Sequence, residues 1–146
     1  MRSAKIDETL LEHGPIIEAE IFSSEEAFLR LKNFGTTENY ARVRLLIDTG
    51  SNISGLDRSY IQKLQLNSIH GDEEWADGPG GMWRVKRYAC ILYLPIFDTK
   101  GLQIEVLEGD YNHTHIHGVV GRDILQYCHF HYDGRNNLFR LEAKEF

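Results

Sequence analysis

The sequence contains little cysteine and proline, and it has no long apolar run. Of its 146 residues only two are cysteine and three are proline. Cys90 and Cys128 lie far apart and form no C-x-x-C pair, so we expect two reduced, mostly buried thiols, with a disulfide as the alternative. No stretch approaches the roughly 20 apolar residues of a membrane-spanning helix. Residues 1–12 carry acids and lack the basic-then-apolar order of a signal peptide.

Positive charge is also scarce, because 16 Lys and Arg face 22 Asp and Glu, for a formal net charge of -6. A chain of this charge is expected to have no nucleic-acid partner. No phosphate-cradling glycine loop and no Ser-His-Asp arrangement is present. The length corresponds to one domain, and the apolar content of 42% is that of an ordinary globular protein. We therefore expect a cytoplasmic protein without a membrane partner, with a polar extension at 1–13 before one domain at 14–146.

The first forty residues predict one strand and one helix. Pro15 opens the apolar segment 16–22, which is typical of a strand. Ser24 is a helix cap, and Glu25 and Glu26 place acids in the first turn. Apolar residues then recur at helical spacing until Gly35, which is typical of a helix end.

The remainder of the chain has mostly the pattern of short strands. Apolar residues alternate with Arg42 and Arg44 between 41 and 47, as in a half-buried strand. Glycine-rich turns at 77–81 and 133–137 predict two hairpins. Further segments are predicted as a helical turn (58–64), strands (102–107, 117–120), a short helix (121–126) and a charged tail (142–146). Short strands joined by such turns predict a mostly β, barrel-like domain.

The strand at 41–47 delivers a carboxylate directly into a turn of small residues, Asp48-Thr49-Gly50-Ser51. An Asp at the end of a buried strand is costly unless it is hydrogen-bonded, and such sites are often functional. Thr49 and Ser51 can donate hydrogen bonds, and Gly50 lets another backbone approach closely. The plainer interpretation is a strand-terminating turn, since Asp and Gly are ordinary turn residues.

Two further segments favour the functional interpretation. Leu46 to Ser51, the glycine-rich segment 78–88 and the segment Val119-Val120-Gly121-Arg122-Asp123-Ile124-Leu125 occur in one order along the chain. Together they resemble the retropepsin family of aspartic proteases over about residues 40–146, with 15–22 as a first strand. The resemblance implies an all-β fold: a small closed β-barrel with a flap hairpin and one short C-terminal helix. The helix near Ser24 would be an insertion near the N-terminus.

The resemblance also implies an aspartic endopeptidase that needs neither metal nor cofactor. Two close carboxylates share a proton, and one acts as general base on water while the other polarises the scissile carbonyl. This chain has only one Asp-Thr-Gly, because Asp98-Thr99-Lys100 breaks the pattern. The second carboxylate is therefore expected from a second copy, in a homodimer that cleaves an extended peptide or an unfolded protein segment.

The same resemblance assigns roles to the neighbours of Asp48. Thr49 would interlock with its counterpart in the second copy, and the Gly50 carbonyl would hold the substrate backbone. A hydrogen bond from Ser51 to the carboxylate would lower the pKa of the dyad. The flap residues Gly78, Pro79, Gly80 and Gly81 would pair with the substrate, and Gly121, Arg122 and Asp123 would support the site.

Three departures from the family pattern are visible. Pro79 stands at the flap tip without the N–H that the family usually offers there. Asn52 occupies a position where the family often has an Asp that pairs with the arginine, so Arg122 needs another acceptor, a carbonyl or a different Asp. The tail after Leu141 is charged, which predicts a dimer interface built differently. These departures leave a rival function: a dimeric peptide-binding or assembly module with little activity.

The histidines and tryptophans offer further interpretations. His113, His115 and His117 alternate, so on a strand they would share one face, which is either an exposed polar face or a metal site; we favour the former. His129 and His131 are interpreted as the polar face of a strand that buries Phe130. Trp75 and Trp83 flank the flap turn, where packing is the default and a contact with substrate is the alternative.

Overall fold

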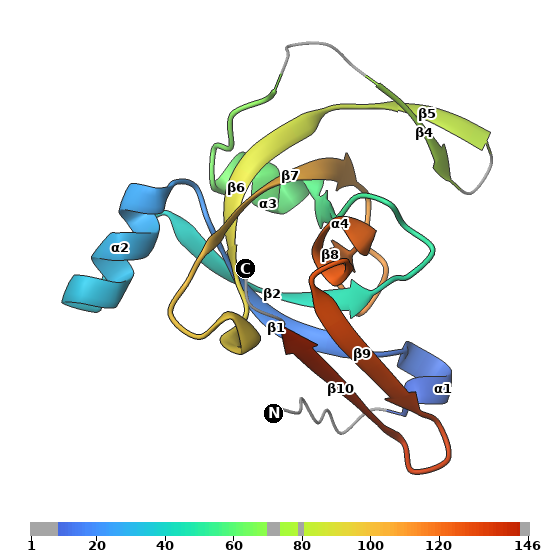
Figure 1. Ribbon diagram of the computed structural model, residues 1–146. Coiled ribbons are helices and arrows are strands. Elements are labelled where there is room, and N and C mark those ends of the chain that lie inside the picture. The colour runs from blue at the N-terminus through green and yellow to red at the C-terminus, as the bar shows by residue number, and fades with distance from the viewer. Residues whose placement is uncertain (1–8, 70–73, 79–80, 144–146) are drawn as a thin grey trace.

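The computed structural model describes residues 9–69, 74–78 and 81–143. Its centre is a closed barrel in which the strands follow the order β1-β2-β8-β3-β7-β6. Figure 1 shows these strands wrapped around one core. Their bounds are β1 (Ile16–Phe22), β2 (Tyr40–Ile47), β3 (Gly55–Asp57), β6 (Arg87–Tyr93), β7 (Leu102–Gly109) and β8 (Gly118–Val120).

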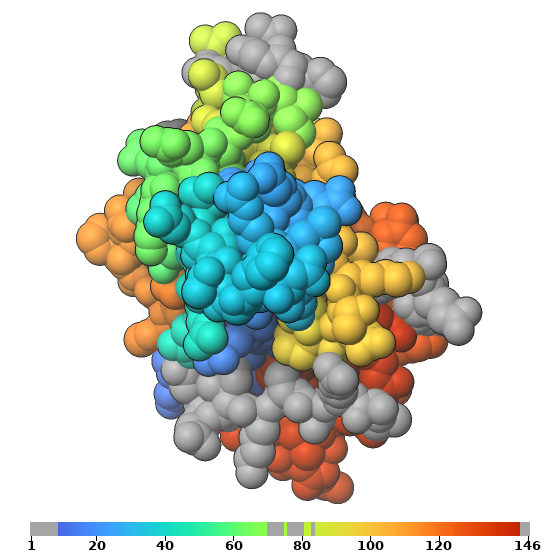
Figure 2. All heavy atoms as spheres, turned by 90° about the vertical axis from the view of Figure 1, so that its left-hand side faces the viewer, coloured from blue at the N-terminus to red at the C-terminus, as the bar shows by residue number. Residues whose placement is uncertain are grey.

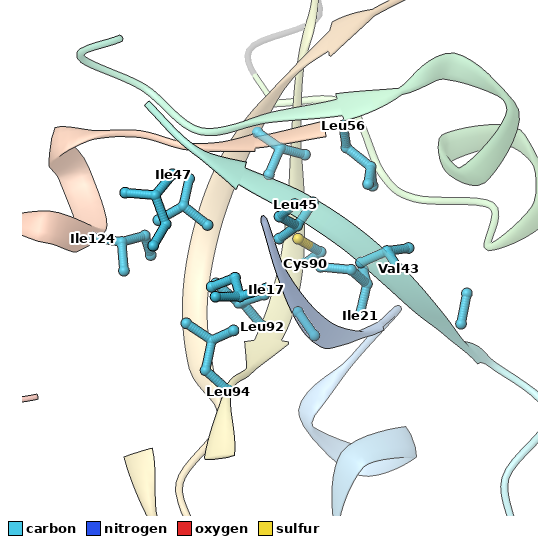
Figure 3. Packing of buried hydrophobic residues seen from close by; sticks show 14 of the residues in the cluster. Ile17, Ile21, Val43, Leu45, Ile47, Leu56, Cys90, Leu92, Leu94 and Ile124 are labelled. Carbon is cyan, nitrogen blue, oxygen red and sulfur yellow. The ribbon is translucent and has the colours of Figure 1, made fainter. Parts of the chain in front are cut away.

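Strand β2 links the core to the site. It pairs antiparallel with β1 from Ile16↔Leu46 to Phe22↔Tyr40, and parallel with β8 from Leu45↔Gly118 to Ile47↔Val120. Because side chains alternate along a strand, one face of β2 enters the barrel. That face consists of Ala41, Val43, Leu45 and Ile47, all of them buried, and Figure 3 shows the last three among their neighbours in the core.

The helical insertion near the N-terminus is confirmed as α2 (Glu25–Phe34). The Ser24 hydroxyl accepts a hydrogen bond from the N–H of Ala27 at 3.1 Å, and Gly35 ends the helix in the left-handed conformation at φ 74°. Phe28 packs edge-on against Phe22 of β1, with ring centroids 5.1 Å apart. This contact holds α2, blue to cyan in Figure 2, against the outside of the barrel.

Two hairpins lie outside the barrel and are seen at opposite sides of it in Figure 1. One consists of β4 (Glu74–Gly78) and β5 (Gly81–Val85), and the other of β9 (Cys128–Asp133) and β10 (Leu138–Ala143). The chain after the turn at 77–81 forms two strands, β5 and β6, which are divided at Lys86. The expected tail at 142 is also wrong at its start, because Glu142 and Ala143 pair with His129 and Cys128.

The remaining helices are short: α1 (Leu10–His13), α3 (Arg58–Lys63), α4 (Arg122–Leu125) and the 3-10 turn η1 (Pro95–Phe97). Leu10 is buried in the core, and its N–H donates to the Asn137 side chain at 2.7 Å. The boundary at residue 13 stays a prediction. No helix in the described ranges has the length and apolarity to cross a membrane. Cys90 and Cys128 are free, as expected.

Candidate active site

Asp48 follows directly on the last residue of β2. Its N–H donates to the Val120 carbonyl at 2.9 Å, so the ladder between β2 and β8 continues one residue past the strand. Ile47 points into the core, and alternation therefore directs the Asp48 side chain to the outer face of the barrel. On that face lie Leu46 and its partner Val119. Asp48 is half-buried and faces outward from the barrel wall.

The turn after Asp48 orients its carboxylate. The N–H of Gly50 donates to Asp48 Oδ1 at 2.9 Å, and the N–H of Ser51 donates to the Asp48 carbonyl at 3.2 Å. A Cβ at Gly50 would approach Oδ1 to 3.1 Å, which is tighter than ordinary contact. Gly50 therefore lets its own N–H come close enough to bind the carboxylate, while the expected approach of another backbone stays a prediction.

The hydroxyl of Ser51 does not bind the Asp48 carboxylate. It donates to the carbonyl of Ile53 at 2.6 Å. A serine in a turn readily binds a carbonyl two residues ahead, and this local bond wins over the one expected to the carboxylate. Ser51 thus stabilises its own loop. The expected hydrogen bond from Ser51 to the Asp48 carboxylate, which would have lowered the pKa of the dyad, is replaced by this bond to Ile53.

A buried serine links this loop to the segment 121–123. Ser54 is only 2% exposed, and its hydroxyl donates to Asp123 Oδ1 at 2.8 Å while it accepts from the N–H of Gly121 at 3.0 Å. The Ser54 N–H donates to the second oxygen of Asp123 at 3.1 Å. Sequence reasoning selected Gly121 and Asp123 but missed Ser54, the residue that connects them.

Arg122 binds the loop from the other side. Its N–H donates to the Ser51 carbonyl at 2.7 Å, and Nη1 donates to the Thr49 carbonyl at 2.8 Å. Of the two acceptors expected for Arg122, a carbonyl or a different Asp, the structure shows a carbonyl. Beside it, a Cβ at Gly121 would lie 2.8 Å from the Ile53 carbonyl carbon and 2.9 Å from the Ser51 oxygen. Only glycine fits there, so the two segments are locked together.

A buried carboxylate, Asp57, holds the chain after β7. Asp57 is 4% exposed, and it accepts hydrogen bonds from the N–H of Tyr111 at 2.7 Å, the N–H of Ser59 at 3.0 Å and the Ser59 hydroxyl. Burial opposes ionisation, but these bonds and nearby His117 outweigh it and hold the pKa of Asp57 below its ordinary value. Asp57 and Tyr111 were not predicted, although an Asp two residues before a Ser at a helix start is a capping signal.

The hairpin β4–β5 carries the other expected site residues. Gly78 pairs with Gly81 at the end of its ladder, while Pro79 and Gly80 lie outside the described residues. Trp75 is 62% exposed, with the guanidinium of Arg84 5.6 Å from the centre of its ring. The side chain of Trp83 is also outside the description, so the packing of the two tryptophans stays a prediction.

The prediction of one histidine-bearing strand face at 113–117 is wrong. The chain forms turns there, with the Thr114 hydroxyl donating to the Tyr111 carbonyl at 2.8 Å. His117 is half-buried, and its Nδ1 accepts from the N–H of Arg44 at 2.9 Å. Burial, with the charge of Arg44, lowers the pKa of His117, against the opposite effect of Asp57. Within the described ranges no three or more potential ligands gather into a metal cluster.

The prediction for His129 and His131 is confirmed. Both are exposed on β9, and Phe130 between them is half-buried and packs against the core. Alternation along the strand accounts for this arrangement.

With this geometry, the chain can be compared with known proteins. No family model matches it, and no curated protein does. Among solved structures, it is similar to EIAV protease in complex with an inhibitor, at a TM-score of 0.53 and 17% identity, over 86% of this chain and 92% of that one. It is also similar to a retropepsin-like aspartic protease from Rickettsia conorii, with a TM-score of 0.48, 14% identity and coverage of 90% and 95%.

The first of these similarities, together with the closed barrel, defines the class of fold. The chain has the retropepsin-like fold: mostly strands around a small closed barrel, with few short helices. The expected fold class is thereby confirmed. Identity this low assigns the fold alone, and the chemistry must be argued from Asp48 and its surroundings.

Proposed function

We propose that the protein is an aspartic endopeptidase whose catalytic dyad forms between Asp48 of two copies. One observation carries the proposal: Asp48 directly follows β2 on the outer face of a retropepsin-like barrel, with its carboxylate oriented by the Gly50 N–H. The loop that holds it is fixed by Ser54 and Arg122, so the carboxylate is positioned before any substrate arrives.

Hydrolysis by carboxylates requires a second carboxyl group, and the two other carboxylates near the loop are already engaged. Asp57 accepts bonds from Ser59 and Tyr111, and Asp123 accepts bonds from Ser54 and from the Ile124 N–H. Both serve to hold the fold. The missing group therefore comes from a second copy of the chain, which a twofold axis through the site would supply.

In the proposed reaction the two Asp48 carboxyls share one proton. The ionised carboxylate takes a proton from a bound water, whose oxygen attacks the scissile carbonyl carbon. The protonated carboxyl donates to the carbonyl oxygen. When the C–N bond breaks, the dyad gives a proton to the departing amine, and a hydroxyl of the tetrahedral intermediate returns its proton to the dyad as the product carboxyl group forms. The dyad again holds one shared proton. No metal or cofactor takes part in this scheme.

The remaining assignments follow the same proposal. The β4–β5 hairpin would act as a flap that adds backbone hydrogen bonds to an extended peptide, which requires an unfolded or accessible substrate segment. Thr49 would contact Thr49 of the second copy, since it is exposed beside Asp48. The free thiols support a reducing compartment, and we place the protein in the cytoplasm.

The experiment that tests the proposal is cleavage of a diverse peptide library, read by mass spectrometry from acid to neutral pH. Asp48→Asn removes the charge, keeps the size and is expected to abolish every cut made by the parent protein. Asp98→Asn is the matched control, because Asp98 is exposed at φ 60°, a conformation that Asn readily adopts.

The control is expected to cut like the parent protein. Cuts that persist in Asp48→Asn would reject Asp48 as the catalyst. A folded, dimeric parent protein that makes no cut at any pH would instead favour a peptide-binding or assembly module.

A further inference from the structure

Two glycines lie on the same outer face of the barrel as Asp48. Gly55 of β3 pairs with Val119 of β8, which itself pairs with Leu46 two residues before Asp48. Paired residues point to the same side of a sheet, and so do residues two apart along a strand. Gly109 belongs to this face as well, because it pairs with Asp57, two residues after Gly55. The outer face that carries Asp48, which forms the wall of the proposed cleft, therefore lacks two side chains on β3 and β7.

The ring of Tyr111 fills the space that these glycines leave, which we call the Gly55–Gly109 recess. A Cβ at Gly55 would lie 2.7 Å from the Tyr111 hydroxyl oxygen, and a Cβ at Gly109 would lie 2.8 Å from Cε2 and 3.2 Å from Cζ of the same ring. The same Gly55 position is 3.5 Å from Val119 Cγ2. The tyrosine thus lies across both strands, with its hydroxyl end toward Val119.

The backbone on both sides of this ring is held in place. The Tyr111 N–H donates to buried Asp57, and the Tyr111 carbonyl accepts from the Thr114 hydroxyl at 2.8 Å. Burial, followed by the negative charges of Asp48 and Asp57, raises the pKa of Tyr111, so the phenol stays neutral. The recess is closed by an uncharged, anchored aromatic ring.

We propose that Tyr111 determines specificity by closing this part of the substrate cleft. The inference rests on the proposed protease function. A peptide side chain that points at this wall meets the Tyr111 ring, so the substrates are extended peptides with a small side chain, such as Gly, Ala or Ser, at the facing position. Because a homodimer presents one Tyr111 on each side of the dyad, the preference falls on two positions equally distant from the scissile bond.

The test is to compare the side-chain preferences of the parent protein, Tyr111→Leu and Tyr111→Ala in the peptide library. Opening the recess is expected to raise kcat/KM for large apolar side chains relative to small ones about tenfold or more, since even one methylene in a pocket changes this ratio by about tenfold. The change is expected at two positions placed symmetrically about the cut. Tyr111→Phe keeps the ring, so we expect it to keep the preference for small side chains. The quantity measured in this variant is the side-chain preference.

Further measurements distinguish a change in side-chain preference from unfolding and from a loss of protease activity. Phe34→Ala removes a 78% exposed aromatic on α2 and is expected to change no preference. Circular dichroism checks that each variant is folded, and Tyr111→Leu replaces Tyr111→Ala if the smaller residue unfolds the chain. Peptide binding to Asp48→Asn, with and without Tyr111→Leu, reports the preference without any need for cleavage.

The outcomes are distinguishable. Cuts that depend on Asp48 but show the same preferences in every Tyr111 variant would overturn the role of Tyr111 and leave the protease intact. If no peptide is cut but peptide binding shows a preference that depends on Tyr111, the protease function would be overturned and the role of Tyr111 in specificity would be supported. No cuts and no peptide binding would overturn both.

Discussion

The loop that carries Asp48 and the β4–β5 hairpin are built in opposite ways. The loop is tied to residues 121–123 through buried Ser54 and through Arg122, with no room for a side chain at Gly121. The hairpin is a two-stranded sheet of its own, on which Trp75 is 62% and Met82 53% exposed. A reacting carboxylate must be held within a fraction of an ångström, whereas an element that admits a peptide must open. The proposed protease needs both properties in one small domain.

Adding a methyl group at Gly121, in the segment that holds the Asp48 loop, is expected to separate the stabilities of the loop and the hairpin most strongly. Gly121→Ala places a Cβ 2.8 Å from backbone atoms that cannot turn away, so we expect the free energy of unfolding to fall by about 3 kcal/mol. Gly81→Ala in the hairpin meets nothing within 4 Å, and its cost is the strain of a positive φ, about 1–2 kcal/mol. Urea unfolding at one protein concentration measures both. Equal losses would mean that the loop is no more constrained than the hairpin.

Removing the Ser54 hydroxyl is expected to have the next largest effect. Ser54→Ala leaves Oδ1 of half-buried Asp123 and the N–H of Gly121 each without one partner, at a cost of about 2 kcal/mol. Ser51→Ala is the matched control, because its hydroxyl binds only the Ile53 carbonyl and its loss costs about 0.5–1 kcal/mol. The same unfolding measurement compares the two serines. If Ser51→Ala lowers the free energy of unfolding as much as Ser54→Ala does, Ser54 does not have a special role in linking the Asp48 loop to residues 121–123.

Acid is expected to weaken the Tyr111 segment through Asp57. The pKa of Asp57 is lower in the folded protein than its ordinary value of 3.8, so its stabilising effect is complete above pH 3.8 and is lost as the pH falls through the lower, folded value. In Asp57→Asn this part of the pH dependence disappears. We expect the free energy of unfolding to fall less between about pH 5 and about pH 2 in the variant than in the parent protein. An equally steep fall in both would assign the acid sensitivity to other carboxyls.

Truncating an exposed side chain of the hairpin is expected to change stability least. Trp75→Ala should alter the free energy of unfolding by no more than about 0.5 kcal/mol, since the side chain is largely in solvent. If the hairpin covers a bound peptide, KM rises several-fold while the melting temperature stays. Steady-state kinetics and thermal unfolding separate the two. A large loss of stability would show that Trp75 supports the barrel.

Most of the fold could be predicted because local signals agreed with the tertiary structure. Alternation at 41–47 and 16–22, the Ser24 cap and the Gly35 stop mark real elements. The strand boundary at Lys86 could not be predicted, because no glycine, proline or other typical turn residue marks it between 82 and 93. The turns at 113–117 were missed because alternating histidines have the pattern of a strand, while His117 instead binds the backbone of Arg44 on neighbouring β2.

Several residues that the sequence grouped around Asp48 are also in contact in the structure, while their roles in catalysis stay predictions. Asp48, Gly50 and Arg122 lie together as expected, and the Thr49 carbonyl accepts from Arg122. The partner of Ser51 was wrong because a nearby carbonyl competes with a carboxylate, and sequence spacing does not rank the two. Ser54, Asp57 and Tyr111 join segments that are distant along the chain, and only the folded structure brings these partners together.

A mixing experiment tests the shared dyad most directly. Parent protein at a fixed concentration is equilibrated with increasing amounts of Asp48→Asn, and the cleavage rate is measured for one library peptide. If each site needs Asp48 from two copies, inactive mixed dimers form and the rate per parent protomer falls in proportion to the fraction of parent chains. A rate that stays constant as the variant is added, with mixed dimers shown by mass spectrometry, would mean that one copy is sufficient and would contradict the account.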